Sequence, residues 1–76
     1  MKVLIQNAED RKFLASDDQW TESPHEAEDF LLGYRAHQLA RSKPCRIFNV
    51  LFYFPELDSF LRVMHGRGTL DASGAH

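Results

Sequence analysis

The chain has 76 residues, of which 43% are hydrophobic, and a formal net charge of −2; these values indicate one folded domain and argue against global disorder. A single cysteine, Cys45, excludes an internal disulfide, and because small secreted domains usually need several, a cytoplasmic protein is expected. No apolar run approaches the ~20 residues of a membrane span, and residues 1–5 are too short for a signal peptide, so no membrane contact is expected.

The first expected element is a hairpin. Residues 2–6 and 11–16 alternate apolar and polar side chains around a polar connection at 7–10, the pattern of an antiparallel hairpin. One face of this hairpin is expected to meet the core and carries Val3, Ile5, Phe13 and Ala15. Leu4 and Leu14 are expected to project from the opposite face.

Helical signals follow in the next third of the chain. Ser23 as N-cap, Pro24 at the first helical position and Glu26 three residues after Ser23 form a capping-box pattern. A short helix is therefore predicted within residues 21–30. Residues 34–42 predict further helix, which Lys43 and Pro44 end.

The most apolar stretch is 46–54, in which seven of nine residues are apolar or aromatic. Its length and its flanking prolines, Pro44 and Pro55, predict a strand on which the other elements pack. One face carries Phe48, Val50, Phe52 and Phe54, and the other carries Ile47, Leu51 and Tyr53. Because both faces are apolar, we expect a sheet that is covered on both sides.

The segment after Pro55 fits two structures. Its apolar residues stand at helical spacing, but residues 59–64 also suit a strand beside the core strand. A turn or short helix at 55–58 is the first choice, and one helix throughout is the alternative. Residues 66–76 contain three glycines and no periodicity, which predicts a flexible tail after a domain at 1–65.

Together these elements predict an α+β fold: an antiparallel sheet of three to four strands with helical segments packed on one face. The opposite face would need its own cover. Either residues 57–64 fold over it or a second chain does, since large exposed apolar patches usually mark interfaces. Because symmetric homodimers are the commonest assembly, we predict a homodimer joined through that face or a sheet edge. The predicted interface residues are Leu4, Leu14, Leu51 and Tyr53.

Residues 12–30, KFLASDDQWTESPHEAEDF, carry a family pattern. In this pattern, a strand ends in an aromatic-Leu pair. A polar turn follows, then Trp-Thr, and then a helix in which Ala and Phe stand three residues apart. The matching positions are Phe13, Leu14, Trp20, Thr21, Ala27 and Phe30. This pattern resembles a group of small uncharacterised bacterial proteins, and the resemblance implies a small α+β domain but no activity.

Catalytic and metal-binding patterns are weak. His25 with Glu28 or Asp29 would share a helix face, but zinc sites normally need three or four ligands, so no metal or other cofactor is expected. No nucleophile elbow, Walker loop or dinucleotide loop is present. An enzyme is therefore not expected.

Nucleic-acid binding is the alternative function. Residues 1–30 carry eight acids and three bases, whereas residues 31–76 carry six bases and three acids. Sheet aromatics with nearby bases stack single-stranded nucleic acid in several small domains. The candidate bases are Arg35, Arg41, Lys43 and Arg46. Because the whole domain is not basic, our first prediction is a non-enzymatic module that self-associates and binds an unknown protein partner, and a single-stranded nucleic-acid binder is the second.

Overall fold

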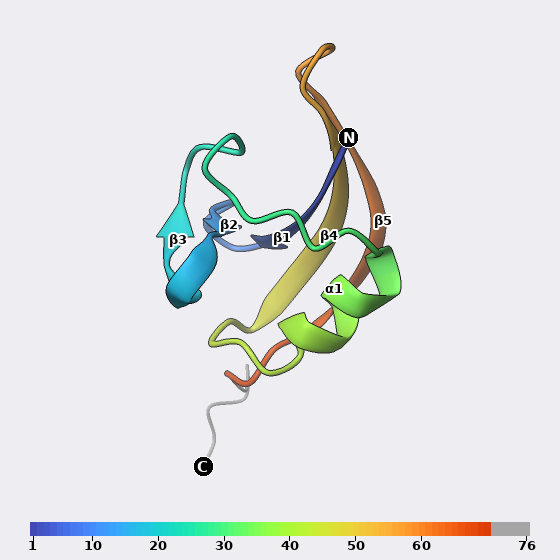
Figure 1. Ribbon diagram of the computed structural model, residues 1–76. Helices are drawn as coiled ribbons and strands as arrows, with labels where there is room; N and C mark the ends of the chain where they lie inside the picture. Colours follow the sequence, from blue (N-terminus) through green and yellow to red (C-terminus); the bar gives the residue numbers. More distant parts are fainter. Residues whose placement is uncertain (71–76) are drawn as a thin grey trace.

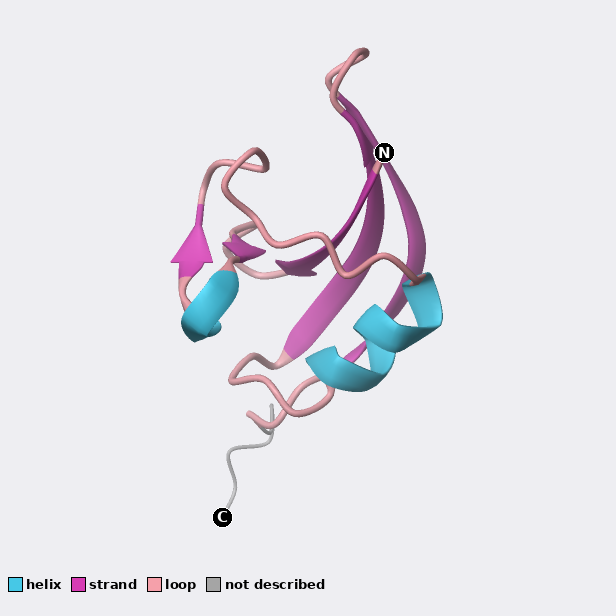
Figure 2. Ribbon diagram, viewed as in Figure 1, coloured by secondary structure: helices cyan, strands magenta, loops and turns pink. Residues whose placement is uncertain are grey.

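The computed structural model describes residues 1–70, apart from the side chain of Asp17. Within this part, one antiparallel sheet has the strand order β3-β2-β1-β4-β5, and one α-helix lies across one face of its long strands (Figure 1, Figure 2). The elements are β1 (Lys2–Asn7), β2 (Phe13–Leu14), a 3₁₀ turn (Ser16–Asp18), β3 (Trp20–Thr21), α1 (Gly33–Ala40), β4 (Ile47–Phe54) and β5 (Ser59–Arg67). The α+β class is confirmed. The strand number is corrected from three or four to five, and the helical layer is a single short helix.

The predicted core strand is β4, and it lies between β1 and β5. Val50 pairs with Ile5 of β1 and with Met64 of β5. Phe48 and Tyr53 are fully buried on opposite faces of the strand. The expectation of a ribbon covered on both sides is therefore confirmed for this part of β4.

The segment after Pro55 is a turn followed by strand β5, so the alternative of one helix throughout is wrong. Phe60 pairs with Tyr53 and Leu61 pairs with Phe52, which places these neighbouring side chains on opposite faces of the sheet. The register shifts by one residue opposite Val50 and Leu51. This bulge adds one residue to β5, and Met64 therefore packs on the α1 side of the sheet. The resulting spacing of three residues between Leu61 and Met64 resembles the spacing of apolar residues on a helix.

The predicted hairpin of β1 and β2 exists, but its side chains face differently from the prediction. Gln6 pairs with Phe13, so Phe13 shares a face with Leu4. Leu14 packs instead with Val3 on the α1 side. Because the side-chain period of a strand is two, a one-residue error in the register exchanges the two faces.

The helix predicted within residues 21–30 does not form. Instead of the predicted capping box, Thr21 makes the side-chain hydrogen bonds of this segment. Its Oγ1 accepts a hydrogen bond from Ser23 N at 3.1 Å and donates one to Glu26 Oε1 at 3.0 Å. Farther along, the segment's backbone bonds to the sheet, since Phe30 N donates to the Val3 carbonyl at 2.9 Å. The capping pattern is real as a local preference, but the sheet provides competing partners for these amides. The predicted segment 34–42 corresponds to α1.

Two apolar clusters lie on the two faces of the sheet. The cluster under α1 contains Val3, Ile5, Leu14, Phe30, Ala36, Ala40, Cys45, Phe48 and Val50. The cluster on the opposite face contains Leu4, Phe13, Ala27, Leu51 and Tyr53. Phe60 stacks beside the second cluster, with ring-centroid distances of 4.7 Å to Tyr53 and 5.6 Å to Phe13. The chain thus covers part of the second face with its own residues.

The described end of the chain lies beside the segment that joins α1 to β4. Gly66 and Arg67 belong to β5, and beyond it Gly68 N donates to the Arg46 carbonyl at 3.0 Å. Leu70 N donates to the Cys45 carbonyl at 3.1 Å. Of the tail expected at 66–76, residues 71–76 lie outside the described residues. No helix within residues 1–70 combines the length and the apolar character needed to cross a membrane.

Candidate functional site

The four predicted interface residues are all buried inside the single chain. Leu4, Leu51 and Tyr53 belong to the cluster opposite α1, and Leu14 belongs to the cluster under α1. Phe13, Ala27 and Phe60 supply contacts that a second chain was expected to make. A partner therefore has no direct access to these four side chains, and any interface must be formed by other residues.

Two of the four predicted nucleic-acid residues are paired with acids. Lys43 pairs with Asp18 at 2.6 Å, and Arg46 pairs with Glu9 at 3.4 Å. Arg35 and Arg41 are exposed on and just after α1. Of the four sheet aromatics expected beside them, Phe48 and Tyr53 are fully buried and offer no surface on which a base could stack, whereas Phe52 and Phe54 are half-buried.

His25 lies against an aromatic side chain rather than in a cluster of ligands. Its Nε2 is 3.3 Å from the Tyr53 hydroxyl, and the two rings meet edge to face with centroids 5.7 Å apart. The Tyr53 hydroxyl also donates to Asp58 Oδ1 at 3.4 Å. Within the part of the chain that the structure describes, no three His, Cys, Asp or Glu residues lie close enough together to hold a metal ion.

Cys45 is buried at the end of the cluster under α1. Burial, with smaller contributions from the charges of Glu9 and Asp10, raises the pKa of its thiol. The thiolate is the reactive form, so this environment suppresses nucleophilic chemistry. Cys45 is therefore part of the packing in this structure.

We expect the Cys45 thiol to react with a thiol reagent only when the chain opens. Modification of the folded protein at neutral pH should be slower than in urea by roughly two orders of magnitude or more. Since folding raises the pKa of the Cys45 thiol, the unfolded chain loses the thiol proton at a lower pH than the folded chain does. Stability should therefore fall with increasing pH above the ordinary thiol pKa of about 8.5. Stopped-flow thiol titration and urea denaturation at several pH values measure both effects; equal rates in the folded and unfolded chain would contradict the burial.

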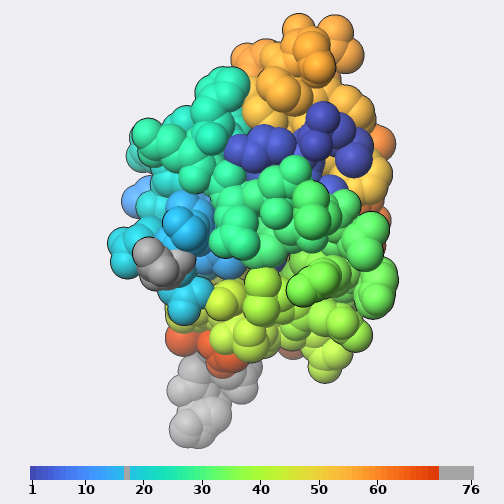
Figure 3. Space-filling view, in the orientation of Figure 1, coloured from blue at the N-terminus to red at the C-terminus, as the bar shows by residue number. Residues whose placement is uncertain are grey.

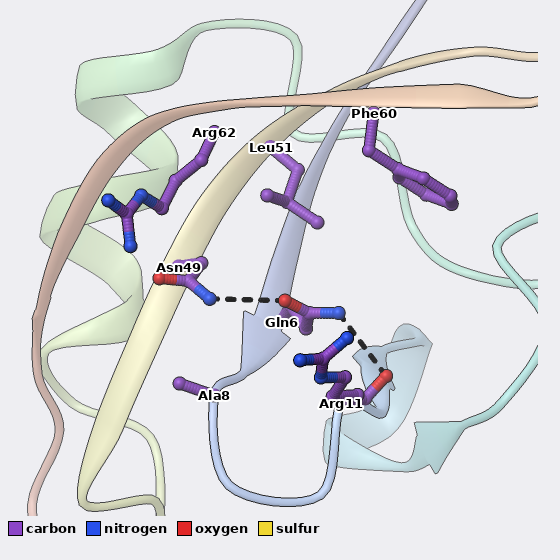
Figure 4. A pocket seen from close by; sticks show the side chains of 7 residues that line it. All are labelled: Gln6, Ala8, Arg11, Asn49, Leu51, Phe60 and Arg62. Carbon is purple, nitrogen blue, oxygen red and sulfur yellow. Dashed lines mark hydrogen bonds between the residues drawn. The ribbon is translucent and has the colours of Figure 1, made fainter.

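A hollow of about 420 Å³ lies on the sheet face opposite α1 (Figure 4). It is lined by Gln6, Ala8, Arg11, Asn49, Leu51, Phe60 and Arg62. The side chains come from β1, β4, β5 and the β1–β2 connection, so the antiparallel sheet brings together residues that are far apart in sequence. Leu51 and Phe60 give the hollow an apolar side, and the other large side chains are amides and guanidiniums.

The two amides of the hollow form a hydrogen-bonded chain with the backbone. Asn49 Nδ2 donates to Gln6 Oε1 at 3.1 Å, and Gln6 Nε2 donates to the Arg11 carbonyl at 3.4 Å (Figure 4). Arg11 itself has a φ of 64°, which an ordinary side chain rarely adopts. The chain of amides thus ends on a strained residue whose side chain borders the hollow.

Among the side chains that the structure describes, no acid lies within ion-pair distance of the guanidinium groups of Arg11 and Arg62. The ion pairs among the described side chains join Lys43 to Asp18 and Arg46 to Glu9, and neither involves these two arginines. Two guanidinium groups with no ion-pair partner among the described side chains therefore border the hollow. Sequence analysis missed this pair because 51 positions separate its members and no local motif connects them.

The outer strand β5 is a second exposed feature. It pairs with β4 on one side, and no other strand within residues 1–70 pairs with its other side. Its side chains include Phe60, which is 43% exposed, and Leu61, which is 55% exposed. Figure 3 shows that the tip of the β4–β5 hairpin projects from the body of the molecule.

No protein-family model, curated protein or solved structure matches this chain. The resemblance of residues 12–30 to small bacterial proteins therefore stays a prediction. Any function proposed for this chain depends on its own geometry.

Proposed function

We propose that this protein is an interaction module that self-associates, with β5 of one copy pairing with β5 of a second copy. The observation that carries the proposal is the outer side of this nine-residue strand, with which no strand within residues 1–70 pairs. Exposed strand edges are templates for pairing with another chain. Two identical edges related by a two-fold axis complement each other, which is the usual geometry of homodimers.

The backbone direction in β5 supports this pairing. In an antiparallel ladder, successive residues direct their backbone groups to opposite sides. Because Ala8 N donates to the Ile47 carbonyl, alternation along β4 directs Leu51 and Tyr53 toward β1. Their β5 partners, Arg62 and Phe60, then direct their N–H and C=O groups to the outer side. These groups are available to a second β5.

The later part of β5 is less open to pairing. His37 Nε2 lies 3.1 Å from the His65 carbonyl, so a side chain of α1 occupies one backbone group of the strand. The bulge around Val63 also interrupts the regular ladder. We therefore place the centre of the pairing in the stretch around Phe60, Leu61 and Arg62.

An apolar surface beside β5 adds to the edge. Gly33, the first residue of α1, lies so close to the outer strands that a Cβ added there would be 2.8 Å from Met64 Cε and 3.8 Å from Phe52 Cε1. Its neighbours Leu32 and Tyr34 are exposed. Burial of such side chains against a second copy would contribute about 25 cal/mol for each Å² of apolar surface.

Light scattering coupled to size exclusion tests the proposal. From about 10 μM to 1 mM protein, the mass is expected to reach twice the chain mass of 8.8 kDa. Leu61→Asp should weaken the dimer at least tenfold, because it places an unpaired charge in the contact.

Leu70→Asp is the matched control. Leu70 is 54% exposed, but it lies beyond the C-terminal end of β5, where its backbone N–H donates to the Cys45 carbonyl. Its variant should keep the dimer. A monomer at every concentration, or equal weakening by both substitutions, would rule out the β5 contact.

A further inference from the structure

We propose that the hollow on the sheet face opposite α1 binds a phosphorylated ligand of about nucleotide size. One chain carries all of its lining residues, so the inference does not depend on self-association. The argument combines the charge of the hollow, its hydrogen-bonding groups, its size and the way in which Arg11 is held.

Charge selects the class of ligand. Arg11 and Arg62 border the hollow from the β1–β2 connection and from β5, and neither has an ion-pair partner among the described side chains. Guanidinium groups bind phosphate through paired N–H donors. Two such groups without acidic partners match the roughly two negative charges of a phosphate monoester.

Polar and apolar groups of the hollow match the rest of such a ligand. Asn49 donates from its Nδ2 to Gln6, which leaves its Oδ1 as an acceptor for a donor group of the ligand. Leu51 and Phe60 provide an apolar side for a ring. The volume of about 420 Å³ lies within the range of small-molecule sites.

The backbone of Arg11 is held in place before any ligand arrives. Its carbonyl accepts a hydrogen bond from Gln6 Nε2, and Gln6 is bonded in turn to Asn49. Its φ of 64° favours glycine or asparagine, yet the chain has an arginine there. The backbone of Arg11 is therefore fixed at the point where its side chain borders the hollow.

The test is a titration of the isotope-labelled protein followed by nuclear magnetic resonance. Adenosine monophosphate is the probe, adenosine is its uncharged counterpart, and a short single-stranded oligonucleotide represents the polymer source of the same chemistry. Adenosine monophosphate is expected to bind with a Kd below about 1 mM and to shift the side-chain amide signals of Gln6 and Asn49. Adenosine should bind at least tenfold more weakly.

Variants connect binding to the two arginines. Arg11→Gly and Arg62→Gln should each weaken binding about tenfold or more. Arg11→Gly should keep the fold, since glycine accepts the positive φ, and should keep the oligomeric state of the parent chain. Arg35→Gln, on the exposed surface of α1, removes the same charge elsewhere and should leave the affinity within about twofold.

The outcomes separate the sources and the alternatives. If the mononucleotide binds, the ligand is a free phosphate ester; if only the oligonucleotide binds with the same dependence on Arg11, the ligand is a single strand. Either result supports the site. Equal binding of adenosine, no binding of any probe, or full affinity in both arginine variants would overturn it. Because light scattering reports self-association separately, a failure of this site leaves the β5 proposal unaffected.

Discussion

Replacing Phe48 with alanine is expected to lower the free energy of unfolding by about 3–5 kcal/mol. Phe48 is fully buried in the central strand β4 and meets the His37 ring edge to face, with centroids 5.2 Å apart. A Cβ added at Gly66 would lie 2.7 Å from Phe48 Cζ, so the ring fills its space against β5 closely. Its removal leaves a cavity that the surrounding sheet cannot close.

The size of this effect follows from the small domain. A chain of 76 residues is expected to have a total stability of roughly 4–11 kcal/mol, so this one substitution removes a large part of it. Urea denaturation followed by circular dichroism measures the change. The control is Ile47→Ala at the preceding position, where the side chain is 43% exposed and the expected loss is below about 1.5 kcal/mol. Equal losses at both positions would contradict the packing of β4.

Replacing Gly68 with alanine is expected to cost about 2–3 kcal/mol, although it adds only one methyl group. A Cβ at this position would clash with the Cys45 carbonyl and would lie 2.6 Å from the Lys43 carbonyl and 2.7 Å from Cys45 Sγ. Two of these three neighbours are backbone atoms. Relief of the clash would therefore have to move the chain that leads into β4.

Gly33→Ala is the matched control for this substitution. The closest atom to a Cβ there is Met64 Cε at 2.8 Å, the end of a flexible side chain, and alanine is also the better helix former. Gly33→Ala is expected to change stability by less than about 1 kcal/mol. Thermal denaturation of both variants provides the comparison. A Gly68→Ala variant as stable as the parent chain would show that residues 68–70 do not pack beside Cys45.

The parts of the fold that sequence predicted correctly are those that depend on strong local signals. The apolar run bounded by Pro44 and Pro55 indicated a strand covered on both faces, and β4 is that strand. The polar connection after β1 indicated a hairpin, which is present. Burial of a long apolar run has few alternatives in a short chain, so these predictions did not require knowledge of distant contacts.

The errors arose where distant partners decide the structure. The side chain of Phe13 faces the cluster opposite α1 because of its pairing with Gln6, and the connection includes the positive φ of Arg11, which no alternation rule anticipates. The helix predicted at residues 21–30 lost its amides to the sheet through bonds such as Phe30 N to the Val3 carbonyl. Tertiary hydrogen bonds outweighed the local capping pattern.

The candidate sites were the least predictable part. The sequence predicts an interface at Leu4 and Tyr53 because two apolar faces need a cover, but Ala27 and Phe60 of the same chain provide that cover. Arg11 and Arg62 become neighbours of one hollow only after β1, β4 and β5 align. The position of both arginines beside the same hollow depends on the strand order, which composition and spacing do not specify.

Pairing of β5 with β5 can be observed directly in a mixed sample of isotope-labelled and unlabelled chains. Isotope-filtered nuclear Overhauser spectra of this sample report only contacts between two copies. We predict cross-peaks between backbone protons around Phe60, Leu61 and Arg62 of one copy and the same segment of the other, since Phe60 and Arg62 direct their backbone groups outward. A spectrum without such cross-peaks at millimolar concentration, from a protein that stays monomeric, would contradict the proposed assembly.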